Sequence, residues 1–338
     1  MTATLDLDSS RVIALVRDHY ALDVLRLESF SGESATTCRI TTADARYVFK
    51  AGIVATDAEV AQVRWQGTVI ADLHRAGLSV QEPVRSLDGE LTVLSSVDGH
   101  SIAMQVFGWL DGDRVADVPM DAALLKDIGT TAARLATALD AVPVSPGPSN
   151  HSWDVRRSAE VLETTLPLLD DHLASLCVRA RDLFLAVDLV GLPSGTVHQD
   201  LNDFNLLAAA SPDGTMAVSG ILDFGDLLDG PKVAELAVAA AYAIRRTSHP
   251  LDALETVVSG WTAVRPLTSQ ECSVIFPIAV ARLAVNAAVW SARLASSRGE
   301  YGQARMGGSV EAVERCLDLD PREVLNRVRG AASLSPVP

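Results

Sequence analysis

Two short polar segments near the middle of the chain carry side chains that could do chemistry. The first contains Asp200 and, five residues later, Asn205; the second contains Asp223, eighteen residues after Asn205. Phosphoryl transfer needs a carboxylate to orient an attacking hydroxyl and accept its proton, and oxygen ligands that hold magnesium against phosphates. Magnesium prefers hard oxygen ligands and takes few of them from a protein. These residues therefore indicate Asp200 as a base, with Asn205 and Asp223 as magnesium ligands.

The same two segments resemble the signature of a known family. Residues 198–205 read His-x-Asp-x-x-x-x-Asn and residues 223–226 begin Asp-Phe-Gly, the two motifs of protein-kinase-like folds. Their form resembles the aminoglycoside phosphotransferase and choline-kinase branch, and residues 226–242 are similar to hydroxylysine-kinase-type members. The resemblance covers most of the chain, from about Val24 to about Trp290. The order and spacing of the two motifs are more specific than either motif alone.

The resemblance implies a co-substrate, a metal and a role for each motif residue. ATP would be bound with Mg²⁺, Asp200 would be the catalytic base, and Asn205 and Asp223 would hold the metal. His198 would be a structural residue that braces the catalytic loop through hydrogen bonds. Lys50, at the end of a strand-like run, matches the lysine that grips the α- and β-phosphates.

The lysine of the family normally pairs with a glutamate on the following helix, and this chain departs from that pattern. Counting back from Gly77, where the predicted helix ends, places Gln66 at the expected position, with Glu59 two turns earlier. Gln66 can accept one hydrogen bond but brings no charge. Either Gln66 holds Lys50 less strongly, or Glu59 replaces it through a shift of the helix. Gln199 is another departure, because the family usually has glycine there.

Two further segments of the first part of the chain are expected to contact the nucleotide. The loop 31–36 should cover the phosphates; it has one glycine, so the hydroxyls of Ser34 and Thr36 are expected to donate instead. A plain hairpin turn explains this loop equally well. The segment 105–109, which includes Phe107, fits the hinge whose backbone meets the adenine, and a core strand is the competing interpretation.

The acceptor site is expected to be acidic, because carboxylates close to the base would neutralise an amine on the substrate. The candidates are Asp203, Asp226 and Glu235, all near the catalytic loop in sequence. Asp226 and Glu235 could equally cap or brace helices. Such a site suits a small hydroxyl-bearing, cationic acceptor: a hydroxylated amino acid, an amino alcohol or an aminoglycoside.

Three hypotheses from different classes remain open at this point. The first is a kinase that phosphorylates a small amine-bearing alcohol. The second is a Ser/Thr kinase that acts on a peptide during natural-product maturation, which would need an open groove lined by apolar residues. The third is a pseudokinase that only binds nucleotides, which the presence of all three catalytic groups disfavours.

The hydrophobic pattern predicts an α+β chain with strands first and helices afterwards. Strand-like runs, separated by polar turns, occupy 24–30, 36–41, 46–51, 91–96 and 101–109. Helical spacing predicts helices from Ser9 or Ser10 to about Tyr20, over 57–75 and near 121–140, 154–169 and 233 onward. Two short strands, 206–209 and 216–222, frame the motif segment.

This order of elements predicts a bilobal protein-kinase-like fold. Residues 1–109 would form a nucleotide-binding lobe, an antiparallel sheet with one main helix. Residues 105–112 would contain the hinge, and residues 113–338 would form a mostly helical catalytic and acceptor-binding lobe.

Composition limits the classes of partner and compartment. The net charge of −15 argues against a nucleic-acid binder, which needs a basic face, and is compatible with a cationic substrate. Cys38, Cys177, Cys272 and Cys316 are widely spaced, which favours a reducing cytoplasm over a disulfide or zinc framework. The N-terminus lacks the basic residues of a signal peptide, and the apolar stretch 276–290 is predicted to be a buried helix rather than a membrane span.

Overall fold

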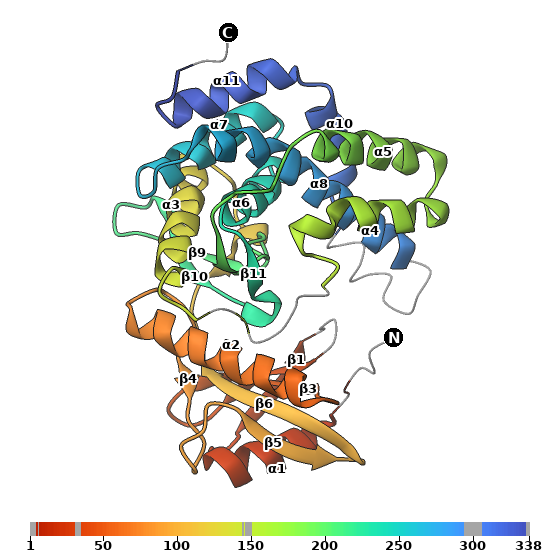
Figure 1. Cartoon of the computed structure of the whole chain (residues 1–338). Helices are drawn as coiled ribbons and strands as arrows, with labels where there is room; N and C mark the ends of the chain where they lie inside the picture. Colours follow the sequence, from red (N-terminus) through yellow and green to blue (C-terminus); the bar gives the residue numbers. More distant parts are fainter. Residues whose placement is uncertain are drawn as a thin grey trace. The chain divides into compact units, whose positions relative to one another are not determined.

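A computed structural model of the chain describes residues 5, 7–30, 35–143, 145, 151–293 and 306–335. The chain forms two compact units (Figure 1). Unit 1 comprises Met1–Asp111 with a short segment at Ser145, and unit 2 comprises the remainder. The predicted α+β class is confirmed, and the division between the units falls within the predicted hinge, residues 105–112.

Unit 1 is built on one antiparallel sheet of six strands in the order β1-β2-β3-β6-β4, with β5 also paired to β6. The strands are β1 (Arg26–Phe30), β2 (Thr36–Thr41), β3 (Arg46–Ile53), β4 (Pro83–Val84), β5 (Val93–Val97) and β6 (His100–Gly108). Two helices accompany them, α1 (Ser9–Tyr20) and α2 (Asp57–Arg75). The short strand β4 was not predicted from the sequence; the other five coincide with predicted runs to within two residues at each end.

The two faces of this sheet have different characters. One face is apolar and packs against α1, whose Val12, Val16 and Tyr20 join Phe49 and Val106 in a buried cluster. Because alternate residues of a strand point to opposite faces, the register places Lys50 of β3 and its partner Gln105 of β6 on the other face. The Gln105 amide donates to the carbonyl of Val63, so α2 lies against that second face, away from α1 (Figure 1).

Helix α2 begins and ends where the sequence predicts. Thr56 and Glu59 form a capping box: the Thr56 hydroxyl accepts the Glu59 N–H, and the Glu59 carboxylate accepts the Thr56 N–H. Past the other end, Gly77 adopts φ of +84°, a left-handed conformation that is strained for a residue with a Cβ. These local signals determine the bounds of α2 without help from tertiary contacts.

Unit 2 is mostly helical. Its helices are α3 (Ala122–Leu139), α4 (Ser158–Thr165), α5 (Asp171–Leu185), α6 (Ala234–Arg245), α7 (Pro250–Thr262), α8 (Ser269–Arg293), α10 (Ser309–Leu317) and α11 (Pro321–Ala331). Short 3-10 helices are η1 (Val115–Asp117), η2 (Val155–Arg157), η3 (Leu166–Leu168) and η4 (Phe224–Asp226). The predicted helix near 154–169 is divided into η2, α4 and η3, with Pro167 inside η3. Helix α5 was not predicted.

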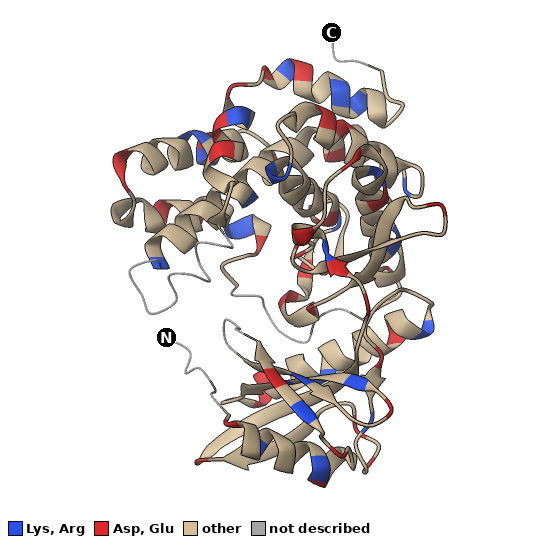
Figure 2. Cartoon of the chain, turned by 180° about the vertical axis from the view of Figure 1, so that it is seen from behind, with Lys and Arg blue, Asp and Glu red and all other residues tan. Residues whose placement is uncertain are grey.

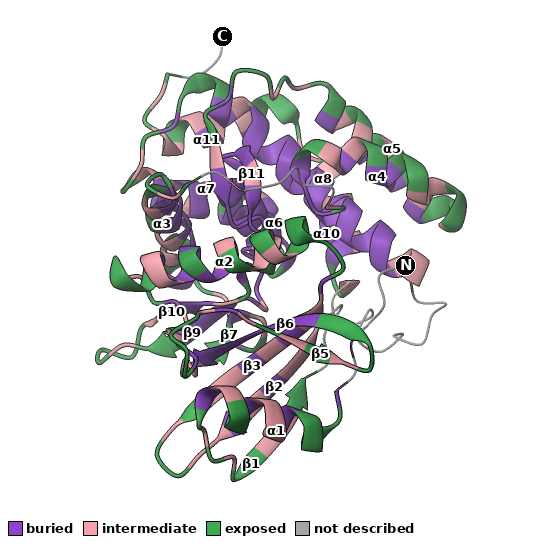
Figure 3. Cartoon of the chain, turned by 60° about the horizontal axis from the view of Figure 1, so that its bottom comes forward, coloured by how far each residue is buried: buried purple, intermediate pink, exposed green. Residues whose placement is uncertain are grey.

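Helices α6 and α8 form the buried centre of unit 2. Every residue of α6 is buried, and α8 is buried from Cys272 to Trp290 except for Ser273 (Figure 3). Among the described residues α8 is the one helix long and apolar enough to cross a membrane by length and composition, and 94% of its most apolar window is buried inside the protein. The predicted buried helix over 276–290 is confirmed.

Two small sheets in unit 2 hold the motif segments. Strands β9 (Leu206–Ala210) and β10 (Met216–Ile221) form a hairpin, and β7 (Asp113–Arg114) pairs with the outer edge of β9. Strands β8 (Ser194–Val197) and β11 (Leu228–Pro231) form a second antiparallel pair. The eight residues between β8 and β9 are the predicted catalytic loop.

Helices α3 and α7 meet through two glycines. A Cβ at Gly129 would lie 1.9 Å from the carbonyl oxygen of Val257, and a Cβ at Gly260 would lie 1.9 Å from that of Lys126. The obstructing atoms belong to the backbone, so no change of side-chain rotamer can relieve them. The side-chain hydroxyl of Thr130 also donates to the Gly260 carbonyl at 3.2 Å, which links α3 to the backbone of α7.

Replacing Gly260 with alanine should therefore destabilise unit 2. Overpacking of this kind costs about 1–3 kcal/mol of the free energy of unfolding, which outweighs the gain of about 1 kcal/mol in helix propensity. Urea denaturation of the variant and wild type measures the difference.

Gly330→Ala is the matched control, since Gly330 lies in α11 and a Cβ there would meet nothing within 4 Å. That variant should be as stable as wild type or more stable. Equal stabilities of the Gly260 and Gly330 variants would contradict the proposed packing.

Candidate active site

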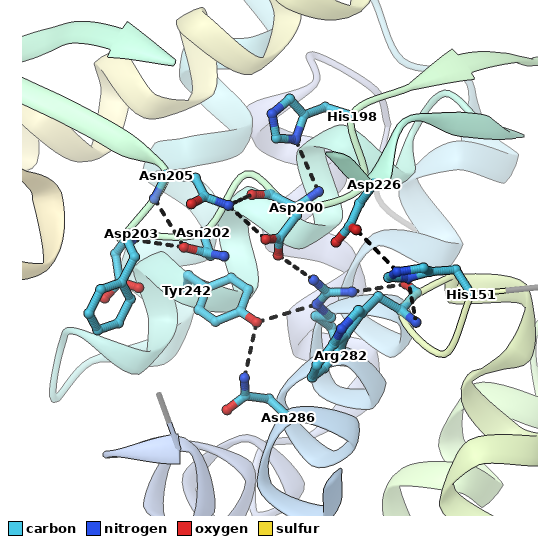
Figure 4. A network of polar contacts seen from close by, with 12 residues as sticks. His151, His198, Asp200, Asn202, Asp203, Asn205, Asp226, Tyr242, Arg282 and Asn286 are labelled. Carbon is cyan, nitrogen blue, oxygen red and sulfur yellow. Dashed lines mark hydrogen bonds and ion pairs between the residues drawn. The ribbon is translucent and has the colours of Figure 1, made fainter. Parts of the chain in front are cut away.

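The loop from His198 to Asn205 is buried although it is rich in polar side chains. His198 and Gln199 are fully buried, and Asn202, Asp203 and Asn205 are at most 5% exposed. The Asp200 side chain, by contrast, is 18% exposed. Figure 4 shows Asp200 at the centre of a network of polar contacts from several elements. The loop therefore presents one carboxylate from an otherwise closed structure.

Asp200 is held at its backbone and at both carboxylate oxygens. Its N–H donates to Nδ1 of His198 at 3.2 Å. Its Oδ1 accepts from Nη2 of Arg282 at 2.6 Å, and its Oδ2 accepts from Nδ2 of Asn205 at 2.7 Å (Figure 4). The carboxylate is therefore fixed in position by contacts from its own loop and from α8.

His198 connects the loop to the elements around it. Because its Nδ1 accepts the Asp200 N–H, its Nε2 carries the proton and donates to the Leu222 carbonyl at 3.0 Å. Its ring meets the ring of Phe224 edge-on at 4.6 Å, and its backbone N–H donates to the carboxyl of Glu235. These contacts support the predicted bracing role of His198.

Asn205 and Asp223 are brought together by the β9–β10 hairpin. The register pairs Leu206, the first residue of β9, with Ile221, the last residue of β10. Asn205 directly precedes Leu206 and Asp223 lies two residues after Ile221, so both residues are at the same end of the hairpin. Asn205 donates to Asp200 through Nδ2, and this orientation leaves its Oδ1 as the end of the amide that a cation can use. Asp223 is exposed and left-handed, with φ of +57°, and its Oδ1 accepts the Gly225 N–H at 3.3 Å. Both residues are thus placed to offer oxygens at one edge of the hairpin.

The three carboxylates predicted to bind the acceptor lie in different environments. Asp203 is 3% exposed and pairs with the buried Arg245 at 2.5 Å. Glu235 is fully buried, and burial raises its pKa to about 8. Asp226 is 24% exposed and contacts Nε2 of His151 at 3.1 Å. The burial of Asp203 and Glu235 argues against contact with a substrate and in favour of bracing roles.

Several residues of the site were not predicted as site residues from the sequence. Arg282 is fully engaged: besides Asp200 it donates to the Trp153 carbonyl at 2.9 Å and to the Tyr242 hydroxyl at 3.4 Å. Asn286 donates to the same hydroxyl at 3.3 Å. The sequence did contain a signal, since Arg282 and Asn286 are polar residues one turn apart in an apolar helix and so share a face.

Gln199 is a strained and unsatisfied residue beside the base. Its φ is +68°, the left-handed region that glycine adopts without cost. Its side-chain amide is buried, and neither Nε2 nor Oε1 has a hydrogen-bond partner among the described residues. Position 199 thus has a backbone conformation that suits glycine although it carries a side chain.

The predicted nucleotide residues that the structure describes all belong to unit 1. Lys50 and Gln66 are both half-buried, on β3 and α2. The carboxylate of Glu59 is taken up by the capping box, which disfavours the alternative that it replaces Gln66.

The remaining nucleotide predictions have different outcomes. The hydroxyl of Thr36 donates to the Leu5 carbonyl at 2.8 Å, so it is already used within unit 1. Phe107 is 5% exposed and paired in β6, as the core-strand interpretation requires. Ser34 lies outside the described residues.

Glu235 should make the stability of the protein depend on pH. The native state keeps the Glu235 proton up to pH about 8, whereas in the unfolded chain the group titrates near the ordinary value of 4.5. Between these values the native state binds more protons, so the free energy of unfolding falls by about 1.4 kcal/mol per pH unit as the pH rises. Glu235→Gln, which cannot titrate, should flatten this slope. Urea denaturation across this range measures it, and parallel curves for variant and wild type would show that the Glu235 pKa is not raised.

The chain is similar to known kinases in sequence and in structure. The phosphotransferase enzyme family model matches residues 27–267. A hydroxylysine kinase of Mus musculus is 27% identical over 266 residues, which are 71% of this chain and 68% of that protein. A hydroxylysine kinase of Danio rerio is 28% identical over 251 residues, 70% of each chain.

Solved structures share the fold over nearly the whole chain. The microcompartment-associated aminopropanol kinase has a TM-score of 0.69 at 16% identity, covering 91% of this chain and 97% of that one. An amicoumacin kinase in complex with AMP-PNP, Ca²⁺ and Ami has a TM-score of 0.69 at 12% identity, covering 94% and 97%. The choline kinase of Streptococcus pneumoniae has a TM-score of 0.55 at 15% identity, covering 90% and 98%. The resemblance noted from the two motifs is confirmed by the family match and by the shared fold, and the chain belongs to the phosphotransferase enzyme family.

Proposed function

We propose that this enzyme transfers the γ-phosphate of ATP to a hydroxyl of a small, amine-bearing acceptor, with Asp200 as the catalytic base. The observation that carries the proposal is the placement of Asp200: it is a partly exposed carboxylate fixed on a buried loop, with the Asn205 amide on one of its oxygens. A base that orients a hydroxyl needs this combination of access and rigidity. The family match and the relatives that are kinases support the reaction class.

The proposed reaction moves one proton and one phosphoryl group. The acceptor oxygen forms a bond to the γ-phosphorus while its proton passes to Asp200, and the bond from that phosphorus to the bridging oxygen breaks, which releases ADP. Because little covalent chemistry falls to the protein, its contribution is to position the groups and to offset charge.

Magnesium is proposed to bind between Asn205, Asp223 and the phosphates. No cluster of three or more His, Cys, Asp or Glu side chains suited to a metal occurs among the described residues. One carboxylate and one amide oxygen suit Mg²⁺, which usually completes its shell with phosphate oxygens and water. Bound Mg²⁺ would offset the charge of the phosphates. Lys50 of β3 and Gln66 of α2 are proposed to bind the nucleotide phosphates.

Asp226 is the carboxylate proposed to receive the amine of the acceptor. It is the most exposed of the three predicted acids, with 24% of its side chain exposed. We keep Asp226 alone in this role, because Asp203 and Glu235 are buried. The four cysteines are buried and free, which supports the proposal of a reducing cytoplasm.

A panel of acceptors tests the function directly. Mg-ATP would be offered with hydroxylysine, ethanolamine, choline, homoserine, several aminoglycosides and Ser-containing peptides, and phosphate transfer would be measured. Asp200→Asn is the blank: its turnover should fall about 100- to 10,000-fold, while Mg-ATP affinity stays near wild type. Asparagine keeps an oxygen that can accept from the buried Arg282 but carries no charge, so the Tm of the variant is measured beside its turnover.

The outcome of the panel separates the hypotheses. Transfer to an amine-bearing small acceptor that disappears in the blank supports the proposal. Transfer to the peptides alone replaces it with the peptide-kinase alternative. Near-normal turnover of Asp200→Asn would remove Asp200 from the role of base.

The metal role of Asp223 has its own test. Asp223→Ala should weaken the Mg²⁺-dependent binding of ATP by about tenfold or more, because one of two proposed protein ligands is lost. Titration calorimetry with Mg²⁺ and with EDTA separates metal-dependent from metal-independent binding. Asp213→Ala is the control, since Asp213 is an exposed aspartate in the turn of the same β9–β10 hairpin. Binding that is equal in both variants would rule out Asp223 as a ligand.

A further inference from the structure

Arg282 is a buried cation in the apolar core of unit 2. Its side chain is 2% exposed, and it lies in α8, where most neighbouring positions are apolar. A buried charge is costly unless it is paired and hydrogen-bonded. Each of its three guanidinium nitrogens has a partner: Nη2 donates to Asp200 Oδ1 at 2.6 Å, Nη1 to the Trp153 carbonyl, and Nε to the Tyr242 hydroxyl. The cost of burial is thus met by contacts that determine where the guanidinium lies.

Aromatic rings and a second layer of hydrogen bonds fix its orientation. The guanidinium carbon lies 4.8 Å from the centre of the Trp153 ring and 5.8 Å from that of Tyr242. The Tyr242 hydroxyl also accepts from Asn286 (Figure 4). The Oδ1 of Asn286 in turn accepts from Ser309 of α10 at 3.1 Å. Because a planar guanidinium has a rigid fork of donors, fixing its plane fixes the direction of each N–H. Arg282 therefore presents a preset donor to Asp200.

This geometry makes the two oxygens of Asp200 unequal. Oδ1 is bound to an arginine that is locked in place by its other contacts. Oδ2 is bound to the side-chain amide of Asn205, a neutral partner on the same loop. A substrate hydroxyl can replace the neutral Asn205 amide at Oδ2 without leaving a buried charge unpaired. Displacing Arg282 from Oδ1 would leave the buried charge of Arg282 without its partner.

We propose that Arg282 is the positioning residue of the catalytic base: it holds Oδ1 of Asp200 so that Oδ2 takes the proton of the acceptor hydroxyl. This inference rests on the proposed function. Arg282 touches neither reacting group and acts through Asp200. The proton leaves the acceptor oxygen for Oδ2 as that oxygen bonds to the γ-phosphorus, while Oδ1 remains on the guanidinium.

The charges around the pair are consistent with this role. Asp226 lies close enough to Arg282 for a charge interaction between them. Figure 2 shows acidic and basic segments interspersed in unit 2. Arg282 offsets negative charge beside the γ-phosphate acceptor and at the same time fixes the base.

The chain offers a matched control in Arg245. This residue is also buried, with 4% of its side chain exposed, and pairs with a buried aspartate, Asp203, at 2.5 Å. Its guanidinium lies 4.8 Å from the centre of the same Tyr242 ring. Arg245 thus shares the burial, the charge pairing and the aromatic neighbour of Arg282, but its partner is not the base. A loss caused only by disturbing a buried arginine should be similar for both.

The experiment compares Arg282→Lys with Arg245→Lys, after transfer by wild type to an acceptor has been established. Lysine keeps the charge but cannot reproduce the three-way fork of donors. We expect Arg282→Lys to lower kcat about 100-fold with little change in the KM for ATP, and Arg245→Lys to keep kcat within about threefold at a similar Tm.

Double variants that also carry Asp200→Asn distinguish a positioning role from a purely structural one, and the quantity measured is their residual rate. If Arg282 acts through Asp200, then Arg282→Lys should not reduce the residual rate of Asp200→Asn further, because effects on one functional unit are not additive. Tyr242→Phe is a milder second variant that removes one acceptor from Arg282 and keeps the ring. Its loss of kcat, expected to be about three- to tenfold, should also vanish in the Asp200→Asn background.

The outcomes distinguish the two levels of the proposal. A wild type that transfers phosphate to no acceptor overturns the proposed function and this inference with it. An active wild type with Arg282→Lys within threefold of Arg245→Lys overturns the inference alone. Full additivity of Arg282→Lys, or of Tyr242→Phe, with Asp200→Asn also overturns it.

Discussion

The catalytic loop is buried, and this constraint shapes the rest of unit 2. A buried polar group without a partner costs about 1–3 kcal/mol, so a polar loop can be buried only if the surrounding elements supply donors and acceptors. The backbone N–H of His198 donates to the carboxyl of Glu235 in α6, and the His198 ring donates to the carbonyl of Leu222, just after β10. The Asp200 carboxylate is met by Arg282 of α8. The two most buried helices of the unit are thus the ones that bring polar partners to the loop.

Some of the described buried groups that lack a partner lie beside this loop. Among the described residues, the buried side-chain atoms without a partner include both ends of the Gln199 amide and one oxygen of Glu235. Gln199 also has a left-handed backbone that a side chain does not favour. Strain and unsatisfied groups concentrated beside a reactive residue are typical of a loop shaped by function as well as by stability.

The sequence predicted those features that depend on neighbouring residues. The bounds of α2 were predicted because its apolar residues follow helical spacing and Gly77 is a local stop signal. The spacing of Asp200 and Asn205 identified the loop because five residues suffice to place both side chains at one site. The α+β order followed from the change in periodicity along the chain.

Features that depend on distant residues were not predictable in this way. Arg282 meets Asp200 across 82 residues, and no local pattern marks that contact. Of the acids expected at the acceptor site, Asp203 is paired with an arginine 42 residues away in the sequence. The sequence shows that acidic residues are present near the motif, but it does not show which of them pair with a cation in the folded protein.

The glycine contact between α3 and α7 has a consequence for how this protein can change over time. When two side chains collide, a smaller residue on the partner helix can restore the fit. Here each glycine faces the carbonyl of the other helix, an atom that no substitution on that helix can remove. If Gly129 or Gly260 is replaced, no substitution on the facing helix can restore the fit. A lasting replacement at either position would therefore require a different spacing between α3 and α7.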